Sequence, residues 1–87
     1  MMKPTIHLNG TSQQELLGNV CQAGDAVADA LTAMGKAYPN ARDYYPQGPG
    51  AYKEALAEHE SRCSRLVTVR GELEELAIAI SDGPEGA

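Results

Sequence analysis

All four aromatic residues of this 87-residue chain are tyrosines, and they gather in one short stretch. They and the basic residues among them are Tyr38, Tyr44, Tyr45, Tyr52, Lys36, Arg42 and Lys53. Residues 36–53 carry three basic side chains and one acidic one, whereas four basic and eleven acidic side chains leave the rest of the chain at −7. Because tyrosine rings stack on nucleobases and arginine binds phosphate through two N–H groups, this stretch could bind a small anionic nucleotide.

The tyrosines also have a structural interpretation, and the sequence leaves both open. They could form a small core that closes one end of a helical hairpin, with Arg42 paired to Asp43 or to a helix-end carbonyl. Some rings could pack while others face outward. The residues predicted to contact a ligand are Arg42, Tyr44, Tyr45, Asn40 and Lys53 around the bend, helped by His7, Asn9, Arg62 and Arg65 from elsewhere.

A second basic group lies further along the chain and alternates with glutamates. Its members are His59, Arg62, Arg65 and Arg70. Such alternation is typical of a solvated, ion-paired helix face. In an oligomer, however, Arg62 and Arg65 from neighbouring subunits could converge on one ligand.

His59 and Cys63 are four residues apart, a spacing that puts both on one face of a helix. The imidazole could activate the thiol, or both could bind a metal together with His7 and Cys21. An antiparallel pairing of Tyr38 with Tyr52 places Cys21 near residue 69, too far from Cys63 for a shared metal or a disulfide. We therefore expect free thiols, packing within the helical seam, and no metal or cofactor.

Other catalytic signatures do not stand out from the background. The carboxylate pairs Asp25 with Asp29 and Glu54 with Glu58 are common on acidic helices, where they face solvent. The chain has no glycine-rich phosphate loop, no nucleophile elbow and no metalloprotease motif. We predict that it is not an enzyme.

Charge and hydropathy restrict the partners. Seven Lys and Arg against twelve Asp and Glu give a net charge of −5, which disfavours binding to nucleic acid polymers. Neither a signal peptide nor an apolar run of membrane-crossing length is visible. We expect a cytoplasmic protein with no membrane partner.

These side chains are positioned by a predicted single domain, 1–87, of the mainly all-α class. Residues 4–10 alternate like a short strand or an extended arm and end in the turn Asn9-Gly10. Helix 12–38 should begin at a capping box, either Ser12 with Glu15 or Thr11 with Gln14, and end before Pro39. The loop 39–50 is rich in Pro and Gly, helix 51–81 follows, and the tail 82–87 frays.

Apolar residues recur every three or four positions along both predicted helices, so the two should pack as an antiparallel hairpin. The stripes are Leu17, Val20, Gly24, Val27, Leu31, Met34 and Tyr38 in the first helix, and Tyr52, Leu56, His59, Cys63, Leu66, Val69, Leu73, Leu76 and Ile80 in the second. Leu16, Val67 and Ile78 lie off these stripes, and a lone strand needs a partner. We therefore expect a homo-oligomer.

The segments TIHLNGTS, ARDYYPQG and AEHESRCSRL resemble a group of short, largely uncharacterised proteins of tailed phages and prophages. The similarity covers most of the chain and implies no established activity. Small phage proteins often counter host defence, and the anti-CBASS and anti-Thoeris nucleotide sponges are similar in architecture, as oligomeric helical hairpins.

The leading hypothesis is accordingly a phage accessory protein that sequesters a small nucleotide-type signal in the host cytoplasm without catalysis. The alternative is a protein-interaction module that docks on a host or phage protein. A weaker alternative is a small thiol- or metal-dependent enzyme that uses His59 and Cys63.

Overall fold

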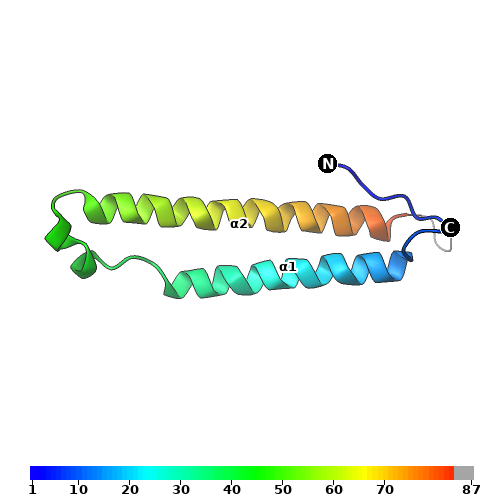
Figure 1. Cartoon of the computed structure of the whole chain (residues 1–87), viewed down its shortest axis with the longest axis horizontal. Helices are drawn as coiled ribbons and strands as arrows, with labels where there is room; N and C mark the ends of the chain where they lie inside the picture. Colours follow the sequence, from blue (N-terminus) through cyan, green and yellow to red (C-terminus); the bar gives the residue numbers. More distant parts are fainter. Residues whose placement is uncertain (84–87) are drawn as a thin grey trace.

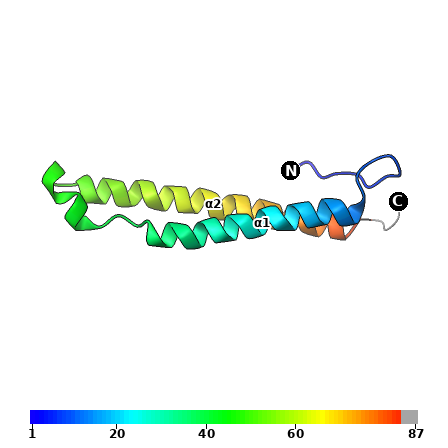
Figure 2. The same ribbon diagram turned by 60° about the horizontal axis from the view of Figure 1, so that its bottom comes forward.

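The computed structural model describes residues 1–83, and two long helices account for most of them. Helix α1 spans Gln13–Lys36 and helix α2 spans Ala51–Ser81, and they lie side by side and antiparallel (Figures 1 and 2). The molecule measures 61 × 20 × 17 Å. The predicted helical hairpin is confirmed, whereas residues 84–87 of the predicted tail lie outside the described range. Neither helix is long and apolar enough to cross a membrane within that range.

Helix α1 begins at the first of the two predicted capping boxes. Ser12 is its N-cap, with extended backbone, and the Ser12 hydroxyl accepts a hydrogen bond from the Glu15 backbone N–H at 3.1 Å. This bond satisfies one of the four N–H groups that a helix leaves free at its start. The cap fixes where α1 starts and therefore where the preceding arm ends.

Helix α1 ends at Lys36, two residues before the predicted end at residue 38. The backbone N–H of Ala37 bonds to the Met34 carbonyl at 3.1 Å, a tightened turn that closes the helix. Pro39 pushes Tyr38 out of the helical region, so the last turn cannot extend further. The connection to α2 consequently starts at residue 37 and includes two short 3₁₀ turns, η1 (Ala41–Asp43) and η2 (Tyr45–Gln47).

The segment before α1 is an extended arm, and the strand predicted as one option for residues 4–10 is wrong, because residues 1–83 contain no strand. A single strand has no pairing partner within this hairpin. Instead, a turn closed by the Gly10 N–H and the His7 carbonyl at 3.1 Å reverses the arm. Ile6 is buried, with its side chain close to Gly83 after the end of α2, and this contact anchors the arm.

Two side chains tie the helices together, one near each end. His59 of α2 hydrogen-bonds through Nε2 to the Met34 carbonyl of α1 at 3.0 Å. The Gln13 amide of α1 donates to the carbonyls of Ile80 at 2.8 Å and Gly83 at 3.1 Å. Each bond joins a side chain of one helix to a carbonyl at, or just beyond, the C-terminal end of the other helix.

The register set by these contacts differs from the predicted one. Tyr38 lies against His59, with ring centroids 4.4 Å apart, and the predicted pairing of Tyr38 with Tyr52 is wrong. Cys21 shares a groove with Leu73 and does not lie opposite residue 69. Both cysteines are free thiols in this arrangement, Cys21 exposed and Cys63 half-buried.

The hairpin has very little core of its own. Among residues 1–83 only Ile6, His59 and Ile80 are buried, and the other apolar side chains along the seam remain partly exposed. The second predicted stripe also needs one correction, because Val69 is 41% exposed and Arg70 lines the groove between the helices instead. Two helices cover only one side of each other, so this thin core is a direct consequence of the fold.

Candidate functional site at the bend

The bend between the helices carries five of the predicted ligand contacts on its turns and on the first turn of α2. Asn40 is the N-cap of η1, and its Oδ1 accepts a hydrogen bond from the Arg42 backbone N–H at 3.1 Å. This bond orders the start of the turn through the backbone N–H of Arg42. The guanidinium of Arg42 takes no part in it. Arg42 is exposed.

The tyrosines divide between the two interpretations. Tyr38 packs its ring against His59 at an interplanar angle of 60°, yet remains 49% exposed. Tyr44 is half-buried, whereas Tyr45 is 76% exposed and Tyr52 is 37% exposed. Edge-to-face contact is a favourable aromatic geometry, so Tyr38 stabilises the end of α1 while Tyr45 presents a free ring to solvent.

The basic side chains of the bend have no acidic partner among the described residues. The ion pair found within residues 1–83 joins Arg70 and Glu74 at 3.5 Å, far from the bend on α2. Asp43 is adjacent to Arg42 in sequence but forms no ion pair with it, so that predicted pairing is absent from the described structure. Arg42 and Lys53 are therefore available to an external anion.

The start of α2 adds unsatisfied donors to this end of the molecule. Gly50 is its N-cap, with φ 90°, and provides no side-chain cap. The N–H of Ala51 bonds to Gly48 at 3.4 Å and that of Glu54 to Gly50 at 2.9 Å, but Tyr52 and Lys53 have no backbone acceptor within the described range. The positive end of a helix favours anions, although Glu54 in the first turn opposes this effect.

The other predicted contacts do not join the bend within one chain. His7 and Asn9 belong to the arm at the opposite end of the long molecule (Figure 1). Arg62 and Arg65 lie nine and twelve residues beyond Lys53 along α2, which corresponds to about 14 and 18 Å. Arg65 donates from Nε to the Ser61 carbonyl at 3.3 Å, and both arginines line a shallow surface depression.

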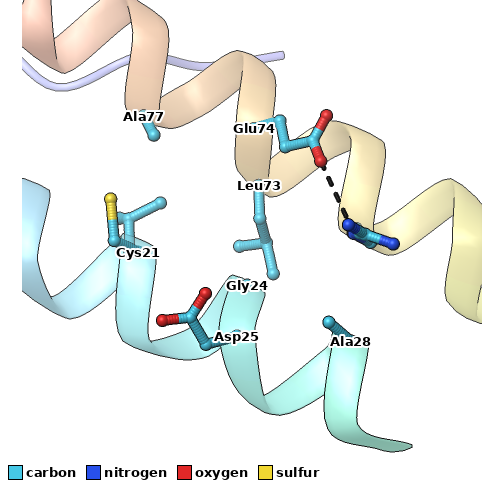
Figure 3. A pocket seen from close by; sticks show the side chains of 9 residues that line it. Cys21, Gly24, Asp25, Ala28, Leu73, Glu74 and Ala77 are labelled. Atoms are coloured by element: carbon cyan, nitrogen blue, oxygen red, sulfur yellow. Dashed lines mark ion pairs between the residues drawn. The ribbon is translucent and has the colours of Figure 1, made fainter. Parts of the chain in front are cut away.

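A groove between the helices is a feature that sequence reasoning missed. It has a volume of about 170 Å³ and is lined mainly by Cys21, Gly24, Asp25 and Ala28 of α1 and by Arg70, Leu73, Glu74 and Ala77 of α2. In Figure 3, Leu73 extends toward Gly24 across the groove. The signal in the sequence was Gly24, a residue without a side chain in the apolar stripe of the first helix.

The described part of the chain does not bring together the residues of a thiol or metal site. No group of three or more His, Cys, Asp or Glu side chains could hold a metal within residues 1–83. His59 is 5% exposed, and its Nε2 must carry the proton because the Met34 carbonyl can only accept. The imidazole is thus engaged in joining the helices.

Comparisons of the chain with protein-family models, with curated proteins and with solved structures gave no match.

Proposed function

We propose that the chain is a non-catalytic binding protein whose bend takes up a small anionic ligand of the nucleotide type. The observation that carries this proposal is the joint presence, at one end of the molecule, of the exposed Tyr45 ring, the unpaired Arg42 guanidinium and the uncapped start of α2. Together the three features recognise both the base and the phosphate of a nucleotide. The ring stacks on the base, and the two positive groups bind phosphate.

The predicted composite site changes in this proposal. Within one chain the ligand contacts come from the bend alone, namely Arg42, Tyr45 and Lys53, with Tyr44 and Asn40 shaping the turns. His7, Asn9, Arg62 and Arg65 could contribute only from a neighbouring subunit. Assembly into a homo-oligomer is part of the proposal, supported by the partly exposed apolar side chains along the seam.

Isothermal titration calorimetry against cyclic dinucleotides and cyclic ADP-ribose isomers tests this function. We expect saturable binding of at least one compound. Substituting Tyr45→Ala should weaken it about fivefold or more, since base stacking contributes about 1–3 kcal/mol, and Arg42→Ala should have a similar effect. Arg70→Ala is a matched control, because it removes an arginine of α2 that is remote from the bend and has no part in the proposed site.

The proposal fails if no compound in the panel produces heat, or if Arg42→Ala binds a ligand as well as the control Arg70→Ala does. Binding that survives Tyr45→Ala but not Arg42→Ala would point to simple anion binding without recognition of a base. If a ligand is found, its sequestration from host signalling is the wider role that the phage resemblance suggests.

A second candidate function is docking on a different protein. The exposed apolar side chains Val67 and Ile78, 57% and 62% exposed, favour it because they lie on one helix and have no packing role in the hairpin. Quantitative affinity capture from a host lysate separates the candidates. A docking module should retain one protein reproducibly and lose it with Val67→Lys, whereas a nucleotide-binding protein needs no such partner.

A further inference from the structure

The groove between α1 and α2 is hollow because several of the residues that line it are small. Gly24 of α1 has no side chain, and a Cβ added there would meet nothing within 4 Å. Ala28 and Ala77 each add only a methyl group to the lining, and Leu73 extends into the space toward Gly24 (Figure 3). These side chains leave a partly open cavity of about 170 Å³.

The floor of the groove is apolar. Val20, Leu73 and Ala77 are half-buried there, so part of the hydrocarbon surface of each still faces water. An alkyl group that lies on this floor leaves water together with the surface that it covers, and the gain is proportional to the area buried. A cavity of about 150 Å³ holds one benzene molecule, so this one suits a ligand of about six or seven non-hydrogen atoms.

The rim of the groove carries an unbalanced negative charge. Arg70 of α2 pairs through Nε with the Glu74 carboxylate at 3.5 Å, whereas Asp25 of α1 has no ion-pair partner among residues 1–83. In Figure 3, the Asp25 carboxylate stands on the α1 side of the groove and the Arg70–Glu74 pair on the α2 side. Two carboxylates against one guanidinium leave the lining at −1, in a chain whose net charge is −5. The groove therefore favours cations.

We propose that the groove binds a small alkylammonium ion, whose hydrocarbon chain covers the apolar floor and whose ammonium group pairs with Asp25. The two halves of such a ligand match the two chemistries of the groove. A neutral hydrocarbon would remove water from the Asp25 carboxylate without replacing it, and a small anion would be repelled. A metal ion is not indicated, because no three His, Cys, Asp or Glu side chains of residues 1–83 could hold one.

This site is separate from the bend and takes a ligand of the opposite charge. Arg70, at the rim of the groove, lies seventeen residues beyond Lys53, which is about 26 Å along α2. The lining spans about two turns of each helix. A hollow of this length suits a free small molecule better than the side of a partner helix.

Nuclear magnetic resonance titration of the full chain with butylammonium tests the proposal. We expect saturable shifts of the backbone amides near Gly24 and Leu73, with a dissociation constant of about 1–10 mM, because the ligand has few atoms. Three probes at matched ionic strength separate the contributions. Methylammonium lacks the hydrocarbon chain, butan-1-ol lacks the charge and butyrate reverses it, so each should bind more weakly than butylammonium.

Two variants of the groove have matched controls on the same helix. Asp25→Asn should weaken butylammonium binding about two- to fivefold, the effect expected of an exposed ion pair, whereas Asp29→Asn removes an exposed aspartate outside the lining and should not. Gly24→Leu should abolish saturable binding by filling the hollow. Gly18→Leu is its control, since a Cβ there also meets nothing within 4 Å but Gly18 does not line the groove.

Circular dichroism of each variant verifies that the helices persist. Binding of butan-1-ol as tight as that of butylammonium, or equal binding by Asp25→Asn and Asp29→Asn, would overturn the role of charge and with it the proposal. Undiminished binding by Gly24→Leu would place the ligand elsewhere and also overturn it. Groove amides that shift with protein concentration and not with butylammonium would show instead that a second copy covers the groove. None of these outcomes affects the calorimetric test of the bend.

Discussion

His59 illustrates how one side chain can serve two elements. It is buried, its Nε2 donates to the end of α1 at Met34, and its ring supports Tyr38. Sequence reasoning placed His59 correctly on the inner face of the second helix but could not identify the acceptor, because a backbone carbonyl leaves no pattern in the sequence. The partner of such a donor is visible only once the register of the two helices is known.

Replacing His59 with alanine should lower the free energy of unfolding by about 2 kcal/mol, because a hydrogen bond and an aromatic contact are lost together. Urea unfolding followed by circular dichroism at a fixed concentration measures this change. His7→Ala is the control, since His7 is an exposed histidine of the arm. Equal stability of the two variants would contradict the role given to His59.

Gln13 closes the opposite end of the hairpin by donating to carbonyls of Ile80 and Gly83. Gln13→Ala should cost about 1 kcal/mol and speed amide hydrogen exchange in the last turn of α2, since the hydrogen bonds from the Gln13 amide to this end of the helix are lost. Gln14→Ala, an exposed neighbour, should change neither quantity. If amide exchange at the end of α2 is unaltered in Gln13→Ala, the hydrogen bonds of Gln13 do not hold the two helix ends together.

At the scale of the elements, two glycines of the hairpin should respond to alanine in opposite directions. Gly24 lies within α1, and a Cβ added there meets nothing within 4 Å, whereas Gly50 has φ 90° at the start of α2. Gly24→Ala should stabilise the fold by about 0.5–1 kcal/mol through higher helix propensity. Gly50→Ala should destabilise it by about 1–2 kcal/mol through left-handed strain.

Thermal unfolding of both variants against the wild type checks these signs. A stabilising Gly50→Ala would mean that the left-handed turn is not required for α2 to start. A destabilising Gly24→Ala would mean that the groove around it must stay open for packing, for example against another subunit.

The helices themselves were predictable because local signals specify them. The cap at Ser12, the apolar period and the Pro- and Gly-rich bend all act over a few residues. The register was not predictable, because pairing Tyr38 with Tyr52 assumed that both helices reach the bend at the same level, whereas the end of α1 lies against His59, well inside α2. Similarly, an alternating pattern in the arm could not reveal that residues 1–83 contain no second strand to pair with it.

At the scale of the whole molecule, the candidate site was only partly foreseeable. Clustering in the sequence located the bend, since neighbours in a loop are neighbours in space. The sequence could not show whether His7 and Arg62 join the site at the bend, because the answer depends on the length of the hairpin. In one chain, that length separates the arm from the bend. These residues can meet Arg42 only across a subunit boundary, which makes the assembly central to any composite site.

The central claim of this account is that a single hairpin is only half of a stable unit. The dependence of the melting temperature on protein concentration tests this claim most directly. Unfolding of a dimer to separate chains should shift the melting temperature upward by about 8 °C for a hundredfold increase in concentration, given typical unfolding enthalpies for two chains of this length. A melting temperature that is the same at all concentrations would contradict the account, because the hairpin would then be stable alone.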